Sequence, residues 1–164
     1  MRIRISSTID APRETVFARM NDLDRAGEWM PGCMVERRTP GPVRVGARWR
    51  ETRRVFGRDW TEEYEVALLD PPERIEVFAD GRKGTTGRGE YRFRLEFEVD
   101  SASRTRVTMT GSATGMGVRG VILAPIMRAI MRRDMVVDLA AAKSWIERVY
   151  RTRPESPQLA SPPT

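Results

Sequence analysis

A stretch of strictly alternating side chains constrains the fold of this chain more than any other feature. From Glu90 to Val99 every second residue is apolar, and the residues between them are all charged. Successive side chains of a β-strand point to opposite faces, so the pattern predicts a strand with one face on a core and one in water. Such strands are typical of antiparallel sheets. The apolar set is Tyr91, Phe93, Leu95, Phe97 and Val99.

The same period of two extends over most of the chain between Cys33 and Thr114. Turn-forming sequences such as Pro40-Gly41-Pro42 and Asp70-Pro71-Pro72 separate the alternating segments. An earlier strand with the same alternation is predicted near the start of the chain. The predicted strands are Arg2–Thr8, Met34–Arg38, Ala47–Val55, Trp60–Leu69, Ile75–Ala79, Arg88–Val99 and Arg104–Thr114.

Two short helices are predicted between the first strand and Cys33. Asp10 is a candidate N-cap for the first of them, with Pro12 in its first turn. The second is predicted over Leu23–Trp29 and ends at the helix-breaking sequence Met30-Pro31-Gly32.

After Gly120 the apolar residues recur with a helical period as far as about Tyr150. A helix of about 30 residues is ~45 Å long, which is enough to cross a whole sheet. The apolar face is displaced near Arg132–Asp134, which predicts a bend or a rotated packing there. The early face comprises Ile122, Leu123, Ile126, Met127 and Ile130. The later face comprises Met135, Leu139, Ala142, Ile146 and Val149.

Together these elements predict one α+β domain over residues 1–150. A sheet with one wet face must cover its other face, and only the C-terminal helix is long enough to do so. We therefore expect a curved antiparallel sheet of about seven strands wrapped around that helix, with space for a ligand between them. Residues 151–164 are rich in proline and serine, and we expect them to form a disordered tail.

Composition excludes several kinds of chemistry. The chain has no histidine and a single cysteine, Cys33, so a Ser-His-Asp triad, an internal disulfide and the usual zinc sites are all impossible. We expect Cys33 to be an inert buried thiol, and we expect no metal and no cofactor. No segment reaches the ~20 apolar residues of a membrane span, and no secretory signal is visible. The expected location is therefore the cytoplasm.

The chain is basic, with 29 Lys and Arg against 23 Asp and Glu and a net charge of +6. Both signs alternate on the wet face of Glu90–Val99, which argues against nucleic acid as a partner. Arg128, Arg132 and Arg133 form a basic helix face that could contact anionic lipid, although a solvated face is the ordinary interpretation of such a pattern.

The order of elements and several motifs resemble the START-related superfamily of polyketide cyclases/dehydrases and lipid-transfer proteins (SRPBCC). The resemblance runs from about Ile3 to Val149 and implies the helix-grip fold with a hydrophobic cavity between sheet and helix. The superfamily hosts binders and enzymes alike, so it implies less about function. The matching motifs are Ile9–Phe17, Asn21-Asp22, Glu28–Gly32, Val45-Gly46, Glu65-Val66, Asp70–Pro72, Arg104–Thr108, Asp138-Leu139, Lys143 and Ile146-Glu147.

Alternation places four polar residues on the inner face of two neighbouring strands: Glu51 and Arg53 on one, Glu62 and Tyr64 on the other. A hairpin that pairs Arg53 with Glu62, Glu51 with Tyr64 and Val55 with Trp60 avoids opposing the two glutamates, and electrostatics favour it. These residues then either close the rim as an ion pair and a hydrogen bond, or act on a ligand.

The leading functional hypothesis is the binding of a hydrophobic small molecule, which is a lipid, a polyketide or another ring-containing ligand, in the cavity between the sheet and the C-terminal helix. The main alternative is a polyketide aromatase/cyclase or dehydratase, with Glu51, Arg53 and Tyr64 as candidate catalytic residues: Arg53 stabilises an enolate while Tyr64 or Glu51 exchanges protons. A third is a protein-interaction module of the Hsp90-activator kind. The predicted ligand-binding residues are Trp29, Trp49, Glu51, Trp60, Glu62, Tyr64, Tyr91, Phe93, Met109, Ile126, Met127 and Ile130.

Overall fold

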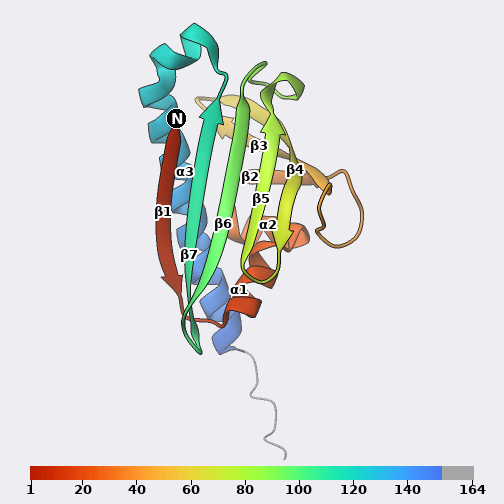
Figure 1. Cartoon of the computed structure of the whole chain (residues 1–164), viewed down its shortest axis with the longest axis vertical. Helices are drawn as coiled ribbons and strands as arrows, with labels where there is room; N and C mark the ends of the chain where they lie inside the picture. Colours follow the sequence, from red (N-terminus) through yellow and green to blue (C-terminus); the bar gives the residue numbers. More distant parts are fainter. Residues whose placement is uncertain (153–164) are drawn as a thin grey trace, which may run out of the picture.

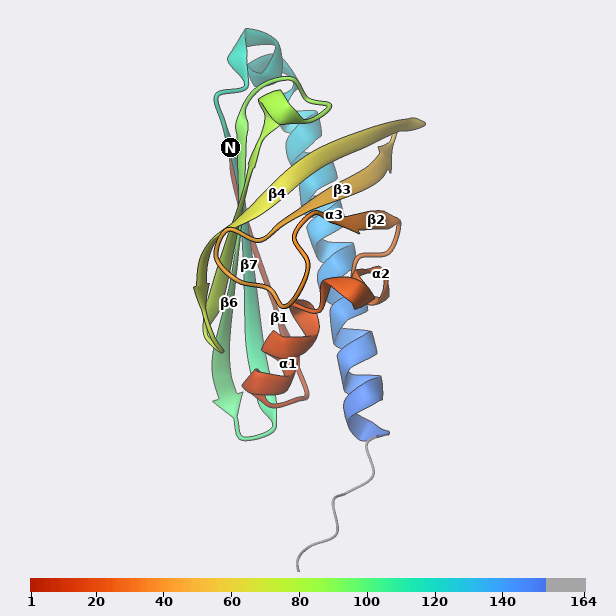
Figure 2. The same cartoon turned by 90° about the vertical axis from the view of Figure 1, so that its right-hand side faces the viewer.

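The chain folds as a seven-stranded antiparallel sheet curved around one long helix (Figures 1 and 2). The computed structural model describes residues 1–152. The strands are β1 (Arg2–Ile9), β2 (Cys33–Arg37), β3 (Arg48–Val55), β4 (Arg58–Asp70), β5 (Arg74–Asp80), β6 (Glu90–Ser101) and β7 (Arg104–Thr114). The helices are α1 (Arg13–Met20), α2 (Ala26–Trp29) and α3 (Gly117–Arg151), with single 3-10 turns η1 (Leu23–Arg25) and η2 (Gly81–Lys83).

The strand order, β1-β7-β6-β5-β4-β3-β2, follows from the chain order. The strands from β2 to β7 each pair with the next strand in the sequence. The N-terminal strand β1 pairs with the last strand, β7, and forms one edge of the sheet. The edge strand β2 and its neighbour β3 curl toward α3, so α3 lies along the concave face of the sheet (Figure 2). This is the helix-grip fold expected from the sequence.

The alternation of β6 is confirmed over most of its length. Tyr91, Leu95 and Phe97 are buried toward α3, and Phe97 packs edge-on against Phe17 of α1. Val99 departs from the pattern and is 60% exposed. The β6–β7 register shifts between Val99 and Ser101, where the strand leaves the core for its turn.

The first helix does not use the predicted cap. Pro12 occupies the N-cap position without a side-chain bond, and the Asp10 carboxylate instead accepts a hydrogen bond from Arg104 Nε at 2.9 Å. As an N-cap, the Asp10 carboxylate would accept hydrogen bonds from the first backbone N–H groups of α1. It pairs instead with Arg104 of β7.

Helix α3 begins at Gly117, earlier than the periodicity predicted, and contains Pro125. Its first turns lie beyond the end of the sheet and at an angle to the rest of the helix (Figures 1 and 2). Proline removes a helical hydrogen bond and crowds the preceding turn, which accounts for a bend in this region rather than at Arg132–Asp134. Because no strand lies opposite these turns, Ile122 and Leu123, which were predicted to face the core, are exposed.

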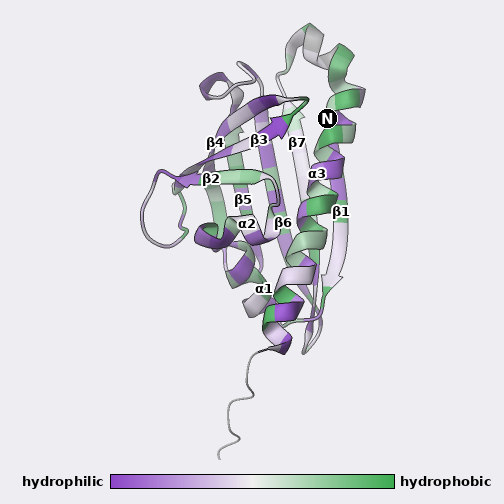
Figure 3. Cartoon of the chain, turned by 180° about the vertical axis from the view of Figure 1, so that it is seen from behind, coloured by the Kyte–Doolittle hydropathy of each residue, from purple (hydrophilic) through white to green (hydrophobic). Residues whose placement is uncertain are grey.

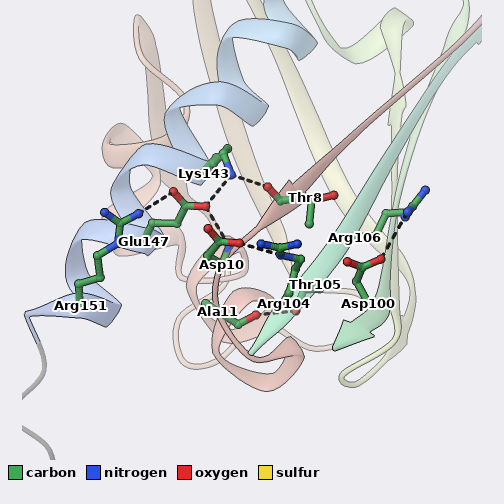
Figure 4. Close-up of polar contacts among 10 residues, drawn as sticks. All are labelled: Thr8, Asp10, Ala11, Asp100, Arg104, Thr105, Arg106, Lys143, Glu147 and Arg151. Carbon is green, nitrogen blue, oxygen red and sulfur yellow. Dashed lines mark hydrogen bonds and ion pairs between the residues drawn. The ribbon is translucent and has the colours of Figure 1, made fainter. Parts of the chain in front are cut away.

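The C-terminal half of α3 is fastened to the end of β1 by a polar cluster (Figure 4). Lys143 Nζ donates to the Thr8 carbonyl and to Glu147, both at 2.6 Å. Glu147 also accepts the backbone N–H of Asp10 at 2.9 Å. The helix continues through Arg151 and Thr152 caps it, so the first two residues of the predicted tail belong to the helix end, and residues 153–164 lie outside the described residues.

Candidate functional site: a cavity between the sheet and helix α3

A cavity of about 200 Å³ lies between the concave face of the sheet and α3. This is many times the ~10–15 Å³ that a single water needs. Aromatic, aliphatic and methionine side chains make up most of its wall. The predicted binding residues that line it are Trp29, Trp49, Glu51, Trp60, Glu62, Tyr64, Tyr91, Phe93, Met109, Met127 and Ile130.

Ile126 is the one predicted binding residue that lies elsewhere. It is 52% exposed on the outer side of α3, whereas its neighbour Met127 lines the cavity. Consecutive helical residues are about 100° apart, so the inward turn of Met127 and Ile130 carries Ile126 out toward solvent. The periodicity predicted which residues form the apolar side of the helix, but not which of them face the cavity.

The β3–β4 hairpin has a different register from the predicted one. Phe56 and Gly57 both have positive φ, 50° and 76°, and form a two-residue turn that pairs Val55 with Arg58. Such a turn matches the twist of the two strands and fixes the register along the whole hairpin. Arg53 consequently lies opposite Trp60, and Glu51 lies opposite Glu62. The predicted Arg53–Glu62 and Glu51–Tyr64 pairings are therefore wrong.

The opposed glutamates are accommodated because each has its own donors. Glu51 accepts the Trp49 indole N–H at 2.8 Å, and its other oxygen is 3.8 Å from Cys33 Sγ. Glu62 accepts the backbone N–H of Thr86 at 3.1 Å and the Thr86 hydroxyl at 2.7 Å. Burial raises the pKa of both carboxyl groups, which favours their neutral forms and weakens the repulsion between them.

Arg53 is bound to α3 instead of to the neighbouring strand. Its guanidinium donates two hydrogen bonds to the Asp138 carboxylate, at 2.7 and 3.2 Å. The side chains are 22% and 8% exposed, so this is a largely buried bidentate pair. Burial raises the pKa of Asp138 to about 6, although the Arg53 charge acts in the opposite direction.

Asp138 is the main residue at this site to which the sequence analysis assigned no role. It was quoted only as part of the family motif. Its signal is its spacing: it lies seven residues after Met131 and three after Met135, within the inward face of α3. An acid within an apolar helix face needs a buried partner, and Arg53 was the one cation predicted to point inward.

Tyr64 sits in the middle of the aromatic wall. Its ring stacks against Trp49 at 6.0 Å and meets Phe93 edge-on at 6.0 Å. Burial raises its pKa well above the usual value, with Glu51 adding to the effect, so the phenol stays protonated at neutral pH and can donate a hydrogen bond.

The side-chain charges of the cavity wall are unbalanced. Among the described residues, Glu51, Glu62, Asp134 and Asp138 line it, against one cationic side chain, Arg53. Arg53 is already paired with Asp138, so the described part of the wall offers an anion no uncommitted cationic side chain. Among residues 1–152 there is also no cluster of three or more acidic, cysteine or histidine side chains suited to a metal ion.

The family model for "Polyketide cyclase / dehydrase and lipid transport" proteins matches residues 1–152. The chain belongs to this family. As a member of the polyketide cyclase/dehydrase and lipid transport family, it shares the helix-grip fold with solved structures of low sequence similarity. No curated protein sequence matches it.

One structural neighbour of this family member is TTHA0849 from Thermus thermophilus, with a TM-score of 0.73 and 19% identity over 93% of this chain and 100% of that one. Another is the Zhui aromatase/cyclase from a Streptomyces species, with a TM-score of 0.72 and 21% identity over 93% of this chain and 96% of that one. At sequence identities this low, the structural similarity establishes the fold alone. Within residues 1–152, no helix is long and apolar enough to cross a membrane.

Proposed function

We propose that this protein binds a neutral, largely hydrophobic small molecule in the cavity between the sheet and α3. The ligand's apolar body packs against the aromatic wall around Trp49 and Tyr64, and its polar group meets the Glu51–Arg53 end. Membership of the family supports a small-molecule role, and a mostly apolar cavity with a few convergent polar groups is the usual form of a ligand site.

One observation carries the proposal: the largely buried Arg53–Asp138 pair and the half-buried Glu51 carboxyl group line a cavity whose wall is mostly apolar. Burying the Arg53–Asp138 pair and Glu51 costs desolvation free energy that hydrophobic side chains of similar size do not incur. A ligand with a carbonyl or hydroxyl group gives these groups a further partner. Arg53 is already paired with Asp138, so a free carboxylate would be buried without a counter-charge from the described side chains of the wall, and a ketone, phenol or alcohol fits better than a fatty acid.

Fluorescence titration with the neutral probe N-phenylnaphthylamine tests this proposal. We expect saturable low-micromolar binding, displacement by a hydroxyanthraquinone, and displacement by oleate that is weaker by at least about tenfold. Val77→Phe, which fills part of the cavity, should abolish binding, and Val99→Phe, at an exposed position on the same sheet, should leave it intact. Absence of saturable binding, or equal competition by oleate, contradicts the proposal.

A second candidate function is a cyclase or dehydratase reaction on a poly-ketone in the same cavity. It is favoured by the raised pKa of Glu51, which makes its carboxylate a stronger base, beside the Arg53 guanidinium. In such a step Glu51 takes the proton from the carbon between two ketones, and the enolate oxygen is stabilised by Arg53 or by the Tyr64 hydroxyl.

Deuterium exchange at the central carbon of a neutral 1,3-diketone, followed by NMR, separates the two functions. An enzyme should accelerate the exchange, and Glu51→Gln or Tyr64→Phe should slow it by roughly 100-fold while probe binding persists. If the wild-type protein binds the diketone without accelerating exchange, the protein is a binder.

The third hypothesis, a protein-interaction module, would use the arginines on the outer face of the sheet. On that face Arg92 and Arg94 are paired with Glu76, and Arg48 is paired with Glu65. These three arginines are neutralised by their neighbours, so they give less support to an acidic partner than the cavity gives to a small molecule.

A further inference from the structure

The outer side of α3 presents apolar side chains to solvent. Val118 and Ile122 are 78% and 72% exposed, and the remaining members of the set are at least 42% exposed. Figure 3 shows this hydrophobic character in the first turns of the helix, which lie beyond the sheet. We call this set the α3 stripe: Val118, Ile122, Leu123, Ile126, Val136 and Val137.

The charges beside the α3 stripe are all of one sign. Arg128, Arg132 and Arg133 are exposed, and none of them forms an ion pair with the side chains that the structure describes. The acids of the same segment, Asp134 and Asp138, line the cavity on the other side of the helix. This differs from the outer face of the sheet, where arginines and glutamates are paired.

We propose that the α3 stripe docks on an anionic lipid surface. An exposed apolar helix face flanked by arginines is the pattern of a helix that lies in the plane of a membrane interface, with apolar side chains among the acyl chains and cations at the phosphates. The helix is not apolar enough to span a bilayer, so it lies on the surface.

Charge disfavours a second copy of the chain as the occupant. In a symmetric dimer the same stripe faces itself, so the interface gathers the Arg128, Arg132 and Arg133 side chains of both copies. The exposed side of this segment carries no acidic side chain among those described, so nothing on the stripe would compensate the repulsion. The anion has to come from the partner.

Docking has a consequence for the cavity. Met127, Ile130 and Met131 line the cavity from the inner side of the same helical segment that carries the stripe. A lipid surface bound to the stripe therefore contacts the segment that covers the cavity. This docking is independent of the proposed ligand and does not require the cavity to be filled.

Co-sedimentation of the full chain with vesicles tests the proposal. We expect binding to phosphatidylcholine vesicles that contain about 30% phosphatidylserine, and binding weaker by roughly tenfold or more to pure phosphatidylcholine. Ile122→Ser and the double variant R132E/R133E should each weaken binding to the anionic vesicles by roughly tenfold or more. Val99→Ser and the double variant R54E/R58E, which has the same change in net charge as R132E/R133E, lie at exposed positions on the sheet; they are the matched controls and should bind as the wild type does.

The cavity variant Val77→Phe should keep vesicle binding even if it abolishes probe binding, so failure of docking and failure of the proposed function are distinguishable. Equal binding to neutral and anionic vesicles, no binding to either, or equal losses in the control variants overturns the proposal. So does a dimer, detected by light scattering, that Ile122→Ser dissociates.

Discussion

Glu51 and Glu62 lie directly opposite each other across the β3–β4 ladder, on the face that lines the cavity. Like charges in this arrangement ordinarily destabilise a sheet. Here the Trp49 indole and Thr86 supply separate donors, and burial raises the pKa of both carboxyl groups. The hairpin thus retains two acids on the face that lines the cavity, and the stability of the fold depends on their protonation.

The first prediction concerns the pH dependence of stability. A carboxyl group whose pKa is higher in the folded state than in the unfolded state contributes stability at low pH, and that contribution falls as the pH rises through the folded pKa. For Glu51 the loss begins near its ordinary value of 4.5, and for Asp138 it extends from 3.8 to about 6. Glu51→Gln keeps an oxygen for Trp49 and removes the titration.

The free energy of unfolding of Glu51→Gln should therefore decrease less than that of the wild type as the pH rises from 4.5 to neutrality. Urea denaturation at several pH values measures the difference. Glu65→Gln, which changes an exposed glutamate on the outer face of β4, is the control and should follow the wild-type curve. Parallel curves for Glu51→Gln and the wild type contradict a raised pKa for Glu51.

The second prediction concerns the Arg53–Asp138 pair. Removing one member of a buried ion pair leaves an uncompensated charge, so Arg53→Met and Asp138→Leu should each lower the free energy of unfolding by about 3–5 kcal/mol. The double variant should lose much less than the sum of the two single losses. Chemical denaturation of all four proteins gives the coupling free energy.

The exposed pair Arg48–Glu65 provides the comparison, because both of its side chains are more than 40% exposed. Arg48→Met should cost at most about 1 kcal/mol. Equal losses for Arg48→Met and Arg53→Met would show that burial of the Arg53–Asp138 pair has no energetic consequence.

The third prediction concerns the turn that sets the hairpin register. Phe56 has a φ of 50° and is 82% exposed, which is an uncommon conformation for a bulky side chain. Asn is favoured at this position of a two-residue turn, so Phe56→Asn should raise the melting temperature. Gly57→Ala introduces a side chain at a φ of 76° and should lower stability by ~1–2 kcal/mol. Thermal unfolding of both variants checks the signs, and a destabilised Phe56→Asn protein contradicts this account of the turn.

The hairpin also shows where sequence alone was insufficient. Alternation correctly predicted which face Glu51, Arg53, Glu62 and Tyr64 share, because the two-residue period depends only on local geometry. The register depends on the turn, and Phe56-Gly57 lacks the Asn or Asp that usually marks a two-residue turn. Electrostatics therefore favoured the wrong pairing. Of the compensating donors, Trp49 shares the inner face of β3 with Glu51, whereas Thr86 reaches Glu62 from the segment after η2 and becomes apparent only once the strands are assembled.

Similar limits apply elsewhere. The seven strands and the long helix were predicted because their periods extend over many residues. The β4 bulge between Val66 and Leu68 was not predicted, and it turns Leu69 toward the core where alternation had placed Leu68. The outward turn of Ile126 and the contact between Arg53 and Asp138, 85 residues apart, depend on how α3 is rotated against the sheet. No local pattern specifies that rotation.

The last prediction concerns the two halves of α3. The C-terminal half is held by the Lys143–Thr8 and Glu147–Asp10 contacts (Figure 4) and by the Arg53–Asp138 pair. The first turns, in contrast, project past the sheet (Figures 1 and 2). Local opening depends on how many such contacts must break. Amide hydrogen exchange in residues 118–130 should therefore be faster than in residues 138–149, by roughly 100-fold.

Lys143→Met tests the cause, because it removes the link to Thr8 and leaves Glu147 without its closest cation. Exchange in residues 138–149 should then accelerate, while exchange in residues 118–130 stays as it is. Arg104→Met, which breaks only the exposed contact with Asp10, is the control and should leave both segments unchanged. Uniform exchange along the wild-type helix, or acceleration of both segments in Lys143→Met, contradicts the division of α3 into a fastened half and a loosely held half.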